Sequence, residues 1–346
     1  MAVAAAAGAD ELPYHAENTN RTERRASIMN SFKFSFGSAA LQGLSWIAVA
    51  GVLWLAPALC VNGAAMGKSF PSPDDAIRAL STAVNNRDSN ALAAIFGPAV
   101  IDLKSPDPVE AQNELATFAK RLNVSHHVER AADGRYILEV GEDGWPFAIP
   151  IVKTNNGWFF DTQAGKEELL NRRIGENELQ ALDSLRAGAQ AQREYASKDR
   201  DGDQVLEYAQ KIISTAGQKD GLYWSQDLGE MSPLGPAFAE ARREGYVKEE
   251  RKEGVPRAFH GYFFKILTRQ GSHAPARAYD YIINGHMIGG YAFVAWPAKY
   301  GVSGIMTFII NQQGKVYQKD LGPDTESAVQ KMNAYDPDKS WSLSRD

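Results

Sequence analysis

Cysteine is almost absent from this sequence. The 346 residues contain one cysteine, Cys60, which lies directly after an apolar segment near the N-terminus. If that segment is removed, the remaining chain has no disulfide, no thiol nucleophile and no thiolate metal site. Small exported domains often depend on disulfides. The roughly 280 residues that follow must instead be stabilised by a hydrophobic core, and a chain of that length can form one.

An excess of positive charge is also missing. The formal net charge is -5, and the first 65 residues contain four basic and four acidic residues, so the rest of the chain keeps that charge. Proteins that bind nucleic acid present a basic face, so we expect no nucleic-acid partner. Hydrophobic residues at 44% and charged residues at 23% are ordinary for a globular protein, and the length is enough for two domains.

The apolar segment, residues 39–59, has the features of an export signal. Lys33 precedes it, and small residues follow it as far as Ala65. A positive stretch, an apolar stretch and small residues at the end are the parts of a signal peptide. Met29 lies where such a peptide would begin. We interpret residues 1–65 as a leader and signal peptide that is cleaved near Ala65, and we expect a periplasmic or secreted protein.

Two alternatives to cleavage remain. The apolar segment approaches the roughly 20 residues of a spanning helix, so it is long enough to stay as a membrane anchor, which would then be the only contact with a membrane. Pro57, near its end, favours cleavage. Lipidation at Cys60 is a third option, but Leu59 stands where a small residue should precede the modified cysteine.

The first part of the remaining chain, residues 70–165, predicts helices followed by strands. Ser72 and Pro73 form a helix start, and apolar residues then recur at helical spacing. Alternating strands follow, joined by a hairpin turn that ends at Gly157. Helices before a meander predict an α+β fold in which the sheet packs on the helices.

The second part, residues 166–346, predicts a long helix packed on an antiparallel sheet. The long helix runs over residues 166–197, a shorter helix over residues 205–216, and a long loop with short helical pieces over residues 217–258. Four strands follow the loop, and they are Tyr262–Leu267, Tyr291–Trp296, Gly304–Ile310 and Val316–Lys319. The overall expectation is therefore an α+β protein with two domains.

Three strings carry a family resemblance. They are "GYFFKILTRQG", "GGYAFVAWPAKYGVSGIMTFIINQQGKVYQKDLG" and the closing "YDPDKSW". They resemble a family of exported bacterial proteins, domain of unknown function 2950, over most of the chain after the signal segment. The resemblance implies export. It assigns no activity and no catalytic residue.

Two fold-level resemblances cover smaller parts. The string "AIRALSTAVNNRDSNALAAIF" with its later Gly-Trp-Phe strand is similar to cystatin-like or nuclear-transport-factor-like (NTF2-like) cone folds. Residues 176–320 follow the order of the globular part of type IV pilin-like and pseudopilin proteins, which pack a spine helix on an antiparallel sheet. In pilins the apolar segment joins the spine helix directly. Here a long stretch of chain intervenes, so assembly into a filament by that route is not expected.

An aspartate-rich turn is the candidate metal site. Asp199, Asp201 and Asp203 alternate in a loop with a glycine, a spacing that can surround a calcium ion with oxygen ligands. The EF-hand pattern requires glycine at the sixth position and glutamate at the twelfth, where this loop has Gln204 and Gln210. The alternative is a solvated turn that ends a helix. Calcium is the only cofactor that the sequence suggests.

No catalytic set stands out. The adjacent pair His126 and His127 would point to opposite faces of a strand, and no HExxH-type spacing supports zinc. Ser303 lacks the G-x-S-x-G frame of a nucleophile elbow. The sequence therefore leans away from an enzyme.

Aromatic residues are candidates for a ligand or partner surface. Trp145, Trp158 and Phe160 are placed to line a pocket in the first part, and Trp296 and Tyr300 are placed to form a ledge for glycan or peptide. Core packing is the alternative for alternating aromatics on a strand. The proline after Trp296 predicts that this end of the strand lies at a sheet edge.

We therefore expect a non-catalytic exported protein of the envelope that binds an envelope protein partner or takes part in assembly. The first alternative is a small-ligand carrier that uses the concavity of residues 70–165. The second is a cell-wall hydrolase, which requires a carboxylate or histidine pair in a cleft.

Overall fold

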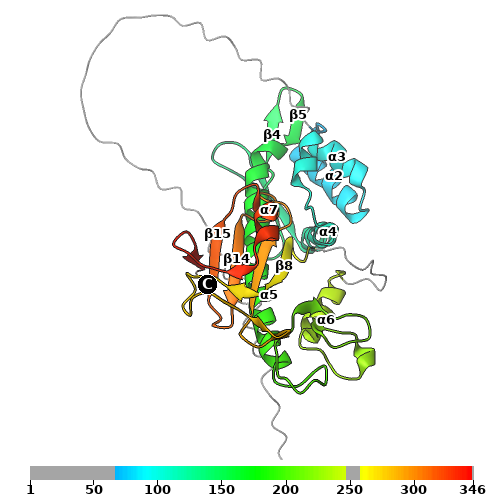
Figure 1. Cartoon of the computed structure of the whole chain (residues 1–346). Coiled ribbons are helices and arrows are strands. Elements are labelled where there is room, and N and C mark those ends of the chain that lie inside the picture. Colours follow the sequence, from blue (N-terminus) through cyan, green and yellow to red (C-terminus); the bar gives the residue numbers. More distant parts are fainter. Residues whose placement is uncertain (1–66, 247–257, 345–346) are drawn as a thin grey trace, which may run out of the picture. The chain divides into compact units, whose positions relative to one another are not determined.

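A computed structural model describes residues 67–246 and 258–344. The predicted leader and export segment lie outside these residues. Within the described part, no helix is both long enough and apolar enough to cross a membrane. The chain combines helices with antiparallel sheets (Figure 1), which confirms the predicted α+β class.

The described chain begins with three capped helices. They are α2 (Pro73–Asn85), α3 (Ser89–Phe96) and α4 (Pro108–Val124), with the 3-10 helix η1 (Pro98–Leu103) before α4. At the start of each helix a side-chain oxygen accepts a hydrogen bond from a backbone N–H, and this oxygen belongs to Ser72 for α2, Asp88 for α3 and Asp107 for α4. These caps satisfy amide groups that have no partner within a helix, so the sequence itself determines where the helices begin.

A first sheet follows these helices. Its strands run in the order β1-β2-β4-β5, with β3 beside β2. They are β1 (His126–Arg130), β2 (Tyr136–Val140), β3 (Trp145–Pro146), β4 (Ile151–Thr154) and β5 (Gly157–Phe160). Thr154 pairs with Gly157, so the predicted hairpin turn is confirmed. Both α2 and α3 contact β5, and the ring of Phe96 on α3 lies 5.3 Å from that of Phe160.

The long helix is α5 (Thr162–Tyr195), which begins four residues earlier than predicted. It contacts β13 (Ala292–Pro297) and β14 (Met306–Asn311) of a second sheet (Figure 1). At Gly188 an added Cβ would lie 3.3 Å from the ring of Phe293. A glycine at this point of the helix therefore allows a close approach to the sheet.

The second sheet has the predicted meander. Its order is β17-β15-β14-β13-β8, and each pairing is antiparallel. The remaining strands are β8 (Tyr262–Leu267), β15 (Val316–Asp320) and β17 (Ser342–Leu343). These ranges agree closely with the four strands expected from the sequence.

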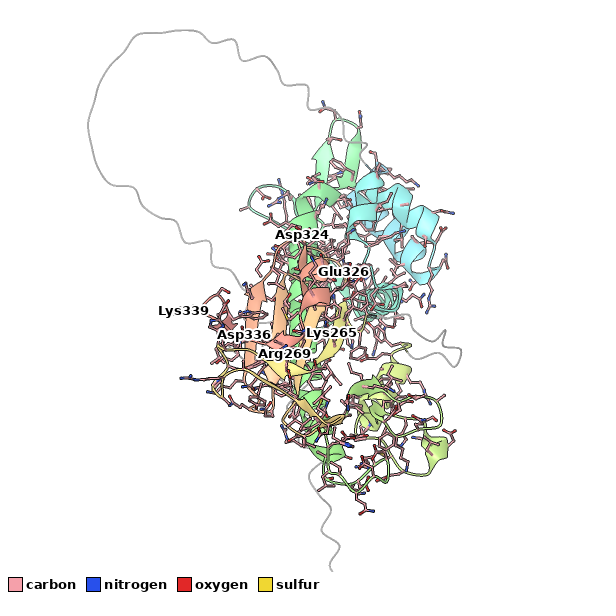
Figure 2. The ribbon with its side chains drawn as sticks, in the orientation of Figure 1. Lys265, Arg269, Asp324, Glu326, Asp336 and Lys339 are labelled. Carbon is pink, nitrogen blue, oxygen red and sulfur yellow. The ribbon has the colours of Figure 1, made fainter. Side chains whose placement is uncertain are left out.

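Helices lie on both faces of this sheet. Phe293 of β13 packs against α5. The next residue, Val294, is paired across the strands with Lys265 of β8. The Nζ of Lys265 donates to the carbonyl of Val329 at 2.9 Å. Val329 belongs to α7 (Thr325–Lys331), and Figure 2 shows Lys265 beside this helix. Successive residues of a strand point to opposite faces, so α5 and α7 cover opposite faces.

The helix predicted over residues 205–216 is wrong. Strand β6 (Lys211–Ile213) occupies part of this range and pairs in parallel with β7 (Gly221–Tyr223). The backbone before β6 bonds to other segments, because Tyr208 donates its amide to Met287 and Ala209 binds the side chain of Gln192. These tertiary hydrogen bonds replace the ones that a helix would have made.

Short elements complete the chain. The predicted loop of residues 217–258 contains β7, a 3-10 helix and one α-helix, and its residues 247–257 lie outside the described part. The other short elements are η2 (Gln226–Leu228), α6 (Gly235–Arg243), β9 (Arg269–Gln270), β10 (Tyr279–Asp280), β11 (Ile282–Ile283), β12 (His286–Met287) and β16 (Ala334–Tyr335).

The proline after Trp296 ends an inner strand of the sheet, and this end of the strand is paired on one side only. Strand β13 lies between β14 and β8, and Pro297 is paired with Tyr262 of β8. Pairing with β14 has already ended at Ala295. Proline is tolerated here because it is the last residue of the strand, where no amide is required on the β14 side.

Buried apolar residues form two clusters. One contains the helices and the sheet before α5, and Leu169 of α5 packs against it. The other contains the second sheet together with Leu182 and Leu185 of α5. The helix α5 therefore contributes to both clusters.

Candidate functional site

The three aromatic residues of the first sheet have different surroundings. Phe160 is 1% exposed and packs in the core. The ring of Trp158 lies 5.0 Å from that of Tyr136, nearly perpendicular to it. Trp145 lies beneath the guanidinium groups of Arg172 and Arg121, at 4.7 and 5.8 Å. Their role in binding a ligand stays a prediction.

The expected ledge at the end of β13 is partly packed. Trp296 is half-buried and packs against the second cluster, with Phe263 5.6 Å away. Tyr300 donates its hydroxyl to Asp320 at 3.1 Å. Burial raises the pKa of Tyr300 above its ordinary value, and this hydrogen bond acts in the same direction.

The aspartate loop does bring its carboxylates together. One oxygen from each of Asp199, Asp201 and Asp203 lies within 4.8 Å of the others, and all three residues are exposed. The carboxylate of Asp199 accepts hydrogen bonds from the amides of Gly202 at 2.7 Å and Gln204 at 2.9 Å. These two bonds hold the pKa of Asp199 below its ordinary value, and the bond from Gln204 has the larger effect. The same bonds are those of a helix-ending turn, so calcium binding stays a prediction.

Two positions of this aspartate loop differ from the EF-hand pattern. Gln204 stands at the sixth position and has a φ of 71°, which is the left-handed conformation for which glycine is usually required. Gln210 at the twelfth position donates its amide to the carbonyl of Gly285. Its side chain therefore holds the loop to a neighbouring hairpin.

Three histidines do not converge on one point. His260 contacts Glu244 at 3.0 Å and His273 contacts Asp336 at 3.0 Å. His286 instead lies 3.1 Å from Asp203. A site built from three histidines is therefore absent from these described residues.

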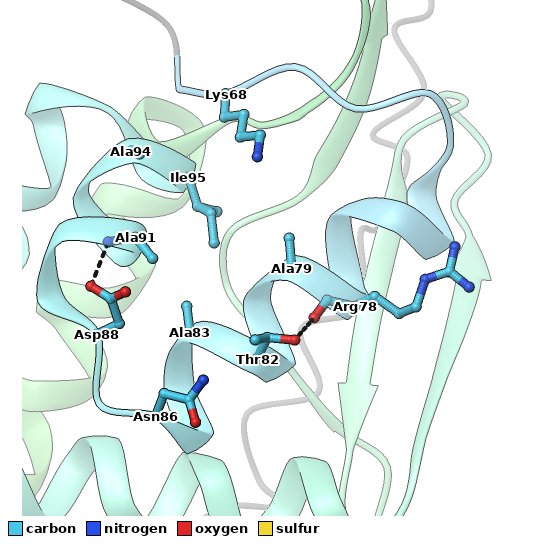
Figure 3. A pocket seen from close by; sticks show the side chains of 10 residues that line it. All are labelled: Lys68, Arg78, Ala79, Thr82, Ala83, Asn86, Asp88, Ala91, Ala94 and Ile95. Atoms are coloured by element: carbon cyan, nitrogen blue, oxygen red, sulfur yellow. Dashed lines mark hydrogen bonds between the residues drawn. The ribbon is translucent and has the colours of Figure 1, made fainter.

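A groove lies between α2 and α3, at the start of the described chain (Figure 3). Its volume is about 350 Å³. The lining residues are Lys68, Arg78, Ala79, Thr82, Ala83, Asn86, Asp88, Ala91, Ala94 and Ile95. Ala83 and Ile95 are buried at its base, whereas Lys68 and Ala94 are exposed. The groove thus has an aliphatic floor and polar sides.

The polar groups of the groove are already partly engaged. Asp88 accepts two amides at the start of α3, including that of Ala91 (Figure 3). Thr82 donates to the carbonyl of Arg78, and the Arg78 guanidinium pairs with Asp75. The Lys68 ammonium lies 5.5 Å from the ring centre of Phe70. Among the described residues, Lys68 has no carboxylate partner.

The comparisons with known proteins give one match. Residues 67–343 match the model of the family described as Protein of unknown function (DUF2950). The chain belongs to this family. No curated protein and no solved structure gives a significant match. The predicted family membership is thereby confirmed, and the likeness to pilin-like proteins gains no support.

This DUF2950 chain also has a buried polar cluster that the sequence does not predict. Arg173 of α5 is 8% exposed. Its guanidinium donates to Glu114 at 3.0 and 3.1 Å and to the carbonyl of Leu103 at 2.7 Å. Arg173 therefore ties α5 to both η1 and α4. Arg173 is one of four arginines in α5, and its position in the sequence gives little sign of such burial.

Glu110 lies beside this arginine. It is 9% exposed, and the hydroxyl of Ser105 donates to its carboxylate. Burial raises the pKa of Glu110, and repulsion from Glu114 acts in the same direction, whereas Ser105 and Arg173 oppose it. In sequence Glu110 looks like an ordinary first-turn acid of a helix, so only the tertiary structure identifies it as buried.

Proposed function

We propose that the protein is a non-catalytic binding protein of the cell envelope, and that the α2–α3 groove takes a small apolar ligand with a carboxylate. The observation that carries the proposal is the groove itself. Its volume of about 350 Å³ falls within the size range of small-molecule sites. Export, as predicted from the sequence, would place it in the envelope.

The floor of the groove favours an aliphatic chain. Ala79, Ala83, Ala91 and Ala94 contribute only methyl groups, and Ile95 adds a branched side chain. Each methylene removed from water contributes about 0.8 kcal/mol. About five methylenes fully removed from water would contribute about 4 kcal/mol, which corresponds to a Kd on the order of 1 mM.

The charge of the groove favours a carboxylate head. The ammonium of Lys68 lines the groove and has no carboxylate partner among the described residues. Arg78 also lines the groove, where it pairs with Asp75. An exposed ion pair contributes up to about 1 kcal/mol. This contribution is enough to distinguish an anionic ligand from a neutral one of the same length.

The groove offers little for hydrolysis. Asp88 is the one carboxylate among its lining residues, and none of them is a histidine. Asp88 is used as the cap of α3. An acid–base pair of the kind a hydrolase needs is thus not part of this groove, which is why we place small-ligand binding ahead of the hydrolase alternative. An envelope protein partner stays a prediction.

Saturation-transfer NMR with three eight-carbon probes tests the proposal. Octanoate should give the strongest signal, 1-octanol a weaker one and octylammonium the weakest. Lys68→Gln should weaken octanoate about threefold and leave 1-octanol unchanged. Ala94→Leu should reduce both signals because the larger side chain fills the groove.

The matched control is Ala116→Leu on α4. Ala116 is exposed and lies outside the groove, so this variant should bind all three probes as the wild type does. Equal binding of octanoate and octylammonium, or unchanged signals in Ala94→Leu, would refute the proposal.

A further inference from the structure

His286 faces two carboxylates that come from a different part of the chain. Its Nδ1 lies 3.1 Å from Oδ2 of Asp203 and 3.6 Å from Oε2 of Glu207. One ligand atom from each of the three residues lies within 4.8 Å of the others. The cluster therefore combines one imidazole with two carboxylates.

We propose that His286, Asp203 and Glu207 bind a first-row divalent cation, with zinc the favoured ion. Zinc takes imidazole nitrogen and carboxylate oxygen at about 2.0–2.2 Å, so neighbouring ligand atoms of a tetrahedral site stand about 3.3 Å apart. The two separations from the histidine nitrogen bracket this value. Calcium prefers an all-oxygen shell, so the imidazole shifts the preference away from the calcium expected for the aspartate loop.

Hydrogen bonds between their segments hold two of the three donors, Glu207 and His286, close together. The amide of Met287 donates to Glu207 at 2.9 Å, and the amide of Tyr208 donates to the carbonyl of Met287 at 2.9 Å. Gln210 donates to Gly285 at 2.6 Å. These bonds join residues 207–210 to the hairpin that carries His286. An ion would therefore find Glu207 and His286 already placed, which reduces the loss of conformational entropy on binding.

Arg200, the basic residue of the aspartate loop, does not neutralise the carboxylates of Asp203 and Glu207. The Arg200 side chain is 3% exposed and turns toward Glu230, to which its Nη1 donates at 2.7 Å. Its guanidinium also lies over the rings of Tyr195 and Trp224. Asp203 and Glu207 therefore keep their negative charge available to a cation.

Calorimetric titration of the whole protein with zinc chloride tests the site. We expect one zinc per chain, and a His286→Gln variant that binds it about tenfold or more weakly. Calcium chloride should bind about a hundredfold more weakly than zinc.

His273→Gln is the matched control. His273 also contacts a surface carboxylate, that of Asp336, which is its one ion-pair partner among the described residues, so its variant should bind zinc as the wild type does. If His286→Gln fails to fold, Glu207→Gln supplies the same readout. The proposal is overturned if zinc does not bind, if calcium binds as tightly as zinc, or if the two histidine variants behave alike.

Discussion

The side-chain amide of Gln192 binds both backbone polar groups of Ala209. Its Nε2 donates to the carbonyl oxygen at 2.8 Å, and its Oε1 accepts from the amide nitrogen at 2.8 Å. Gln192 is fully buried and Ala209 is 1% exposed. This pair of bonds fixes the extended segment that precedes β6 against the long helix α5.

Gln192→Leu should destabilise the protein strongly. The substitution leaves the amide and carbonyl of Ala209 buried without partners, and each unsatisfied group costs about 1–3 kcal/mol. We expect the free energy of unfolding, measured by urea denaturation, to fall by about 2–4 kcal/mol. Gln190→Leu on the exposed side of the same helix should change it by less than about 0.5 kcal/mol. Similar losses in the two variants would contradict this reading.

Two glycines of α5 should respond in opposite ways to alanine. A Cβ on Gly165 would lie 2.7 Å from Cα of Ile149, whereas a Cβ on Gly175 meets nothing within 4 Å. Gly165→Ala should therefore destabilise by about 1–3 kcal/mol, because backbone has to move. Gly175→Ala should stabilise by about 0.5–1 kcal/mol, because alanine loses less entropy in a helix. Thermal unfolding of both variants checks the pair, and a shift in the same direction would refute it.

The sequence was sufficient for the parts of the fold that depend on local patterns. Capping residues such as Ser72 and the hairpin at Gly157 are read directly from neighbouring residues, and the structure has the corresponding helix and turn. The prediction of a helix over residues 205–216 was wrong because the backbone of this segment forms hydrogen bonds with the distant residues Gln192 and Met287. Local propensity holds no information about such partners.

The candidate site was less predictable for the same reason. The spacing of Asp199, Asp201 and Asp203 was visible in the sequence, but the approach of His286 depends on the packing of a hairpin far along the chain. The groove was missed because its floor is made of alanines such as Ala83, which at helical spacing indicate a packed face. Only the relative placement of α2 and α3 leaves some of them uncovered.

Arg173 and Glu114 should show a measurable coupling. Their bidentate pair joins α5 to α4, and the arginine side chain is 7% exposed whereas that of Glu114 is 42% exposed. Arg173→Met should lower the free energy of unfolding by about 2–3 kcal/mol, partly because the Leu103 carbonyl loses its donor. A double-mutant cycle with Glu114→Gln should give a coupling of about 1 kcal/mol. A coupling of zero would mean that the two side chains act independently.

Glu110 should make the stability depend on pH in an unusual direction for a carboxylate. Its pKa is raised on folding, chiefly by burial, from an ordinary value of 4.5. A group of this kind contributes stability that is fully present below its ordinary pKa and is lost as the pH rises through the folded pKa. The wild type should therefore lose stability relative to Glu110→Gln as the pH increases from about 4 to 8.

Urea denaturation of the two proteins at a series of pH values measures this difference directly. Glutamine keeps an oxygen that can accept from Ser105, so Glu110→Gln retains the hydrogen bond without the charge. Glu176→Gln, an exposed position on α5, is the control and should follow the wild type at every pH. If Glu110→Gln also runs parallel to the wild type, the carboxyl is not the source of the pH dependence and its burial has no energetic consequence in this range.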